Sequence, residues 1–87
     1  MGDSVKILYF AWVRERVGVA EEDVSPPTGV DTVAALIEWL AARSDAHAAA
    51  FAERHRLRAA VDQAFVPLGS PIAGAREVAI FPPVTGG

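Results

Sequence analysis

The 87-residue sequence contains no cysteine. This absence excludes a disulfide, a thiolate nucleophile and a cysteine-ligated metal site. Any thioester or persulfide chemistry would therefore have to be carried out by a partner. A chain without cysteine also suits a reducing cytoplasm.

The sequence also lacks a surplus of basic residues. Lys and Arg together number 8 and Asp and Glu 11, giving a formal net charge of -3. A surface for nucleic acid is therefore not expected. The one basic cluster, Arg54, His55, Arg56 and Arg58, is typical of a solvated surface, with a patch for a nucleotide or an acidic partner as the alternative. His47 and His55 lie eight positions apart, which does not match the ligand spacing of a metal site.

No apolar run approaches the length of a membrane span, and Asp3 stands where a signal peptide would be basic. We therefore expect a cytoplasmic protein without a membrane segment. A chain this short buries only about 60% of its unfolded surface, so it needs an efficient core. Its hydrophobic content of 52% indicates that it has one.

The first half of the chain alternates strand and helix patterns. Residues 5–10 predict a strand whose second face is also apolar at Leu8 and Phe10, so it is either covered on both sides or meets a partner at its far end. Residues 11–17 predict a short helix ended by Gly18 in a left-handed conformation. Residues 19–25 predict a charged edge strand.

The main helix is expected to begin at Asp31 or Thr32, either of which can accept hydrogen bonds from free N–H groups. Its apolar stripe consists of Val33, Leu36, Ile37 and Leu40. Trp39 lies off this stripe and is expected at the rim of the core. A second helix is expected over residues 46–54, with Phe51 as its large anchor.

The remaining chain predicts three short strands. They cover residues 57–61, 64–68 and 77–81, with a turn at Asp62 and Gln63 between the first two. This order predicts an α+β fold of the β-grasp type, a mixed sheet with its first and last strands side by side and the main helix across one face. Residues 1–81 would form this domain and residues 82–87 a flexible tail.

Three phenylalanines are predicted to gather where the tail leaves the sheet. Phe10 and Phe81 would end neighbouring strands on the face away from the main helix, and Phe65 could join them. Such a patch would suit a protein partner. The alternative is that the three rings pack under the second helix or under loops.

The chain ends in Gly86 and Gly87 after the stiff pair Pro82 and Pro83. Glycine has no Cβ, so this end can slide a bare backbone and its carboxylate into a narrow channel. At ordinary glycine frequency, two terminal glycines occur by chance in only about one chain in 200. The pattern favours a functional tail over a frayed end.

These residues resemble the small subunit of molybdopterin synthase, the ubiquitin-like sulfur carrier of molybdenum cofactor biosynthesis. The resemblance runs over residues 5–87 and is most specific in the final block, residues 77–87 (EVAIFPPVTGG). Asp62 stands where this family usually has Asn, and Arg76 where it usually has Asp.

The resemblance implies a β-grasp carrier that is not itself catalytic. Gly87 would be adenylated with ATP by a ubiquitin-activating-enzyme-like adenylyltransferase, converted to a thiocarboxylate with a sulfur donor protein, and inserted into the large subunit. There it would give its sulfur to cyclic pyranopterin monophosphate. Residues inserted with Gly87 would be Pro82, Pro83, Val84, Thr85 and Gly86. Residues contacting the large subunit would be Phe10, Arg14, Phe65 and Phe81.

Other readings of the tail remain open. A thiocarboxylate at Gly87 could serve thiamine, cysteine or tRNA thiolation instead. The chain could also be a protein modifier joined through Gly87 to a lysine, or an interaction module in which the tail is incidental.

Overall fold

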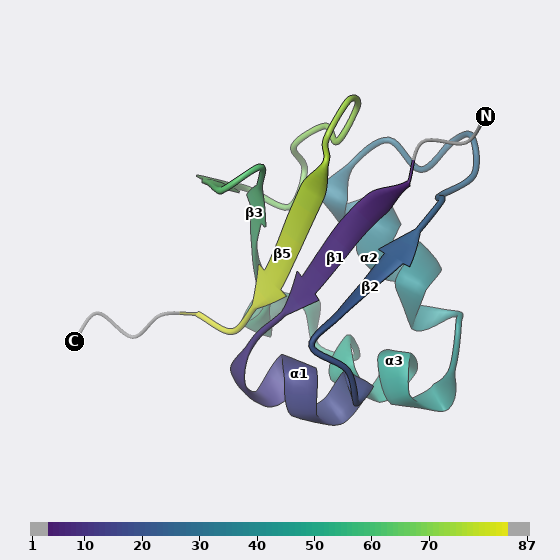
Figure 1. Ribbon diagram of the computed structural model, residues 1–87. Helices are drawn as coiled ribbons and strands as arrows, with labels where there is room; N and C mark the ends of the chain where they lie inside the picture. The colour runs from purple at the N-terminus through teal and green to yellow at the C-terminus, as the bar shows by residue number, and fades with distance from the viewer. Residues whose placement is uncertain (1–3, 84–87) are drawn as a thin grey trace.

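The computed structural model describes residues 4–83 and is shown in Figure 1. The elements in chain order are β1 (Val5–Tyr9), α1 (Ala11–Val17), β2 (Glu21–Val24), α2 (Val33–Ala41), α3 (Asp45–Ala50), the 3-10 turn η1 (Arg54–Arg56), β3 (Arg58–Val61), β4 (Ala64–Val66) and β5 (Glu77–Phe81).

The strands form one sheet in the order β2-β1-β5-β3-β4. β1 and β5 run parallel, with Ile7 opposite Val78, while the other neighbouring pairs are antiparallel. The first and last strands therefore lie side by side, as the sequence predicts, and β2 is an edge strand. Both β1 and β5 point toward the end of the sheet where α1 lies (Figure 1).

Helix α2 covers one face of the sheet, and its boundaries follow from local chemistry (Figure 1). The Thr32 side chain accepts a hydrogen bond from the Ala35 N–H at 3.1 Å, which satisfies one of the free donors of the first turn. All four residues of the predicted stripe are fully buried, and Trp39 is half-buried at the rim. The stripe packs with the inward-facing residues of the central strands to form the core.

The second helix is shorter than the predicted 46–54. The Ser44 side chain caps α3 by accepting from the His47 N–H, and the helix ends after Ala50. Phe51 leaves helical geometry with φ -107° and ψ 17° because its fully buried ring packs near Tyr9, with 6.0 Å between centroids. The Arg54 Nε donates to the Phe51 carbonyl at 2.9 Å, and Arg54 belongs to η1 instead.

Three strands are also shorter than the sequence predicts. β2 begins at Glu21, β3 begins at Arg58, and β4 ends at Val66. Pro67, directly after β4, has no N–H to donate to a sheet. Gly18 follows α1 with φ +99°, and its N–H bonds to the Arg14 carbonyl, which confirms the predicted left-handed helix end. No helix within residues 4–83 combines the length and apolarity needed to cross a membrane.

Candidate functional site

The predicted phenylalanine cluster forms where the central strands end. Phe10 follows β1 in extended conformation and precedes α1, so its ring can stand on the sheet face that α2 leaves open. Phe81 is the last residue of β5, and Phe65 comes from β4. The Phe65 and Phe81 rings lie 5.6 Å apart with an interplanar angle of 46°.

These rings surround a hollow of about 470 Å³ on the open face. Its lining also includes Leu8, Ala60, Ala79, Pro82 and Pro83. Ala60 and Ala79 stand opposite each other on β3 and β5, so the sheet offers a floor of small side chains between the large rings. Such a hollow can receive an apolar projection of a partner.

The hollow is open to solvent rather than packed under another element. Phe65 is 80% exposed and Phe10 47% exposed. The alternative that the three rings pack under the second helix or under loops is therefore wrong. By contrast, Phe51, the residue directly after α3, is fully buried in the core.

The lining contains few groups that could perform chemistry. Glu77 and Gln63 are its only polar side chains among residues 4–83. This part of the chain also brings together no cluster of three His, Cys, Asp or Glu side chains that could hold a metal ion.

Arg14 is exposed on α1, and its N–H donates to the Phe10 carbonyl at 3.3 Å, but Arg14 does not line the hollow. A larger hollow of about 560 Å³ lies at Ser4, Asp31 and Gly74, away from every residue that the sequence singled out as a site. The predicted tail begins with Pro82, which is half-buried, and Pro83, which is exposed. Val84, Thr85, Gly86 and Gly87 lie outside the described residues.

A partly buried polar link on the helix side of the sheet was missed by the sequence analysis. The Tyr9 hydroxyl donates to Glu22 Oε2 at 2.6 Å, and His47 Nε2 lies 2.7 Å from the same oxygen. The Ser44 hydroxyl is 2.7 Å from His47 Nδ1, and Arg43 is 3.9 Å from Glu22 Oε1. These contacts tie α3 to β1 and β2.

The link perturbs the two acids in it. Burial would raise the pKa of Glu22, but hydrogen bonds from His47 and Tyr9 and the charges of His47 and Arg43 outweigh burial and hold this pKa below its usual value. Burial, followed by the hydrogen bond to Glu22 and its negative charge, raises the pKa of Tyr9. The sequence offered one indication of this link, the position of Glu22 in a charged strand. That pattern predicted an edge strand and gave no indication that Glu22 would contact Tyr9 and His47.

Comparison with known proteins gives consistent matches over nearly the whole chain. The model of the ThiS family matches residues 7–87. The molybdopterin synthase sulfur carrier subunit of Escherichia coli (strain K12) is 46% identical over 83 residues, covering 95% of this chain and 99% of that protein.

Two solved structures resemble the fold. The putative molybdopterin converting factor, subunit 1, of Pyrococcus furiosus has a TM-score of 0.74 and 31% identity, covering 93% of this chain and 98% of that one. SAMP1 of Haloferax volcanii has a TM-score of 0.70 and 27% identity, covering 97% and 99%.

Proposed function

The chain belongs to the ThiS family, and from this premise we propose that it is the sulfur-carrier subunit of a molybdopterin synthase. The observation that carries the proposal is the near-full-length similarity to a subunit of that name, on a β-grasp fold. The open face adds support, because β5 ends beside an apolar hollow and continues directly into the tail.

The proposed chemistry takes place at the Gly87 carboxylate. A carboxylate is a poor electrophile because its oxygen is a poor leaving group. Attack of this oxygen on the α-phosphorus of ATP releases pyrophosphate and gives an acyl adenylate. The terminal sulfur of a persulfide on the donor protein then attacks the acyl carbon and AMP leaves. A thiol cleaves the S–S bond of the resulting acyl disulfide by thiol–disulfide exchange, which leaves the thiocarboxylate on Gly87 and a disulfide on the thiol side. The adenylyltransferase and the sulfur donor protein supply these steps, so the chain acts as a protein-bound co-substrate in the cytoplasm.

The large subunit is the proposed acceptor of this tail. Its surface would contact Phe10, Phe65 and Phe81, while Val84 to Gly87 enter its active site. Residues 82–87 can extend about 20 Å, enough to reach a buried site from a body docked outside. There the thiocarboxylate would give its sulfur to cyclic pyranopterin monophosphate.

The tail sequence suits this insertion. Pro82 and Pro83 restrict the first part of the tail to extended conformations, which lowers the entropy lost on insertion. Gly86 and Gly87 carry no side chain, so a narrow channel can enclose them.

Intact-protein mass spectrometry tests the proposal directly. The full chain is incubated with ATP, a cognate activating enzyme and a sulfur donor. We expect a mass increase equal to replacement of one oxygen by sulfur, located on Gly87 by fragmentation. The loaded carrier should then convert cyclic pyranopterin monophosphate when the large subunit is added.

Gly86→Leu is the matched control, because it should block loading without altering the folded body. Failure of the wild-type chain to acquire sulfur from a competent activating system would contradict the proposal. Covalent conjugates of higher mass through Gly87 would instead indicate a protein modifier.

A further inference from the structure

The sequence contains a single lysine, Lys6, while its other seven basic residues are arginines. This difference is chemical as well as electrostatic. A lysine amine becomes a nucleophile when it loses its proton, whereas the arginine guanidinium stays protonated in proteins. Apart from the amino terminus, Lys6 is therefore the one amine in the chain.

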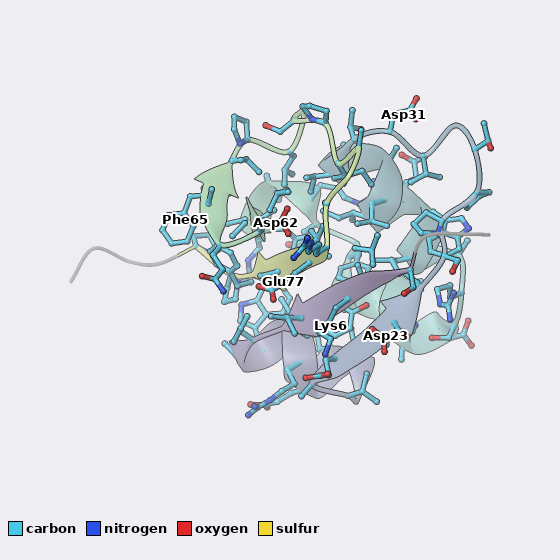
Figure 2. The ribbon with its side chains drawn as sticks, turned by 45° about the horizontal axis from the view of Figure 1, so that its top comes forward. Lys6, Asp23, Asp31, Asp62, Phe65 and Glu77 are labelled. Atoms are coloured by element: carbon cyan, nitrogen blue, oxygen red, sulfur yellow. The ribbon has the colours of Figure 1, made fainter. Side chains whose placement is uncertain are left out.

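Lys6 lies among carboxylates on the open face of the sheet. It is directly opposite Asp23 of β2 and Glu77 of β5, and Figure 2 shows it between these two residues. Its Nζ is 3.2 Å from Glu21 Oε2. The hydrogen bond and charge of Glu21, followed by the charges of Asp23 and Glu77, raise the pKa of Lys6. The free amine is correspondingly scarce.

The parallel register of β1 and β5 places Lys6 within reach of the tail of the same chain. Lys6 is beside Glu77, and Phe81 is four residues further along β5, about 13 Å away at roughly 3.3 Å per residue. The six residues that follow Phe81 can extend about 20 Å. Their carboxyl end can therefore fold back to Lys6, and short flexible connections give effective concentrations in the millimolar range.

An activated Gly87 next to a free amine would be consumed. The amine nitrogen would attack the glycyl carbonyl carbon, a C–N amide bond would form, and the C–O bond to AMP would break. AMP would leave, and the ammonium proton would pass to solvent. The product is an internal isopeptide, which can no longer accept sulfur.

Arginine occupies the basic position closest to the base of the tail in the sheet register. Arg58 is directly opposite Phe81, and its Nη1 donates to the carbonyls of His55 and Leu57 at 3.1 Å and 2.9 Å. Basic character is thus retained beside the tail without a nucleophilic amine.

We propose that the body of this carrier is kept unreactive toward its own activated C-terminus, because Lys6 is held as an ammonium by Glu21, Asp23 and Glu77 and because the basic residue beside the tail is an arginine rather than a lysine. This arrangement reserves the acyl group of Gly87 for sulfur. The inference rests on the proposed function, because low reactivity of the amine matters only in a chain whose own carboxyl group becomes activated.

The test uses the full chain carrying a C-terminal thioester on Gly87, generated by intein cleavage, which needs no activating enzyme. The comparison runs from pH 7 to about pH 9, a range below the ordinary lysine pKa. It includes wild type, the single variants Lys6→Arg and Arg58→Lys, and the double variant Glu21→Gln/Asp23→Asn. Mass spectrometry counts internal isopeptide, lighter than the hydrolysed chain by one water, and fragmentation separates Lys6, the new lysine and the amino terminus. Circular dichroism verifies folding.

We expect wild type to lose its thioester by hydrolysis, with isopeptide at Lys6 a minor product that is absent from Lys6→Arg. The Glu21→Gln/Asp23→Asn variant should form it several-fold faster, because removal of two carboxylates that favour the ammonium increases the free-amine fraction at a given pH. Arg58→Lys should form an isopeptide at its new lysine several-fold faster than wild type does at Lys6.

Equal rates at Lys6 with and without Glu21 and Asp23, or no isopeptide in a folded Arg58→Lys chain, would overturn the inference. Neither result bears on sulfur loading, which is measured separately with the activating enzyme. Failure of this inference is therefore distinguishable from failure of the proposed function.

Discussion

Asp62 fixes the turn between β3 and β4 in a conformation that most residues avoid. It has φ +48°, and its Oδ1 accepts from the backbone N–H groups of Arg76 at 2.9 Å and Glu77 at 3.0 Å. The side chain thereby joins this turn to the start of β5. Because Asn presents the same oxygen and tolerates the same conformation, the family's usual residue and Asp62 are interchangeable in structural terms.

We predict that Asp62→Ala lowers the free energy of unfolding by about 1–3 kcal/mol, because two backbone donors lose their acceptor and alanine disfavours positive φ. Asp62→Asn should cost less than about 1 kcal/mol. Urea denaturation measures both. Asp62→Gly separates the causes, since it relieves the backbone while still losing the hydrogen bonds; a Gly variant as stable as wild type would contradict the role of the acceptor.

Single-residue roles were predictable where they depend on local chemistry. The turn at Asp62 and Gln63 was predicted correctly, and both residues adopt positive φ. The acceptor role of Asp62 was not predictable, because its partners lie 14 and 15 residues further along the chain. The same holds for Glu22 and His47, which are 25 residues apart and meet only when α3 packs against β2 in the folded chain.

At the scale of elements, the hydrogen bonds among Tyr9, Glu22 and His47 hold α3 against β1 and β2. The pKa of Glu22 is lower in the folded chain than its ordinary value of 4.5, so the folded state binds this proton less readily than the unfolded state. Its contribution to stability is therefore complete above the unfolded pKa and is lost as pH falls through the lower folded pKa.

We predict that wild type loses more stability than Glu22→Gln as the pH falls below about 4.5, the ordinary glutamate pKa. The difference between the two chains should be nearly constant above that pH. Denaturant unfolding at a series of pH values measures it, and Glu15→Gln on α1 serves as the exposed control. Parallel pH profiles for wild type and Glu22→Gln would show that the link does not stabilise the carboxylate.

Element types followed from sequence periodicity, whereas several boundaries did not. The stripe of α2 repeats at helical spacing, so its buried face could be predicted from Val33 to Leu40. The end of α3 is set by burial of Phe51 and by the bond from Arg54 to its carbonyl. An alanine-rich segment favours helix by propensity alone and carries no signal for that tertiary contact.

At the scale of the whole molecule, two phenylalanines show how core and contact surface are separated. Phe51 is fully buried among the helices and β1, whereas Phe65 stands 80% exposed on the open face. Stability and partner binding should therefore depend on different rings.

We predict that Phe51→Ala lowers the free energy of unfolding by about 3–5 kcal/mol, while Phe65→Ala changes it by less than about 0.5 kcal/mol. Phe65→Ala should instead weaken binding to the large subunit by about 2 kcal/mol, as expected for a central aromatic contact. Thermal unfolding and calorimetric titration with the large subunit measure the two effects. Undiminished affinity of Phe65→Ala would remove this ring from the interface.

The overall architecture was largely predictable because the order of strands and helices leaves few unknotted arrangements. The position of the phenylalanine cluster also followed, since Phe10 and Phe81 end adjacent strands. The hollow between the rings could not be predicted from the sequence. It depends on the small side chains of Ala60 and Ala79, which stand opposite each other on β3 and β5. That register is fixed only when the sheet is complete.

The central position of β5 also has a consequence for synthesis of the chain. β5 is the strand that connects the pair β1 and β2 with the pair β3 and β4, yet it is made last. A nascent chain still lacking β5 has no continuous sheet and no hollow, because Ala79 and Phe81 belong to that strand. The five-stranded sheet can therefore form only after β5 has been synthesised. A chain that terminates before β5 therefore lacks the phenylalanine hollow altogether.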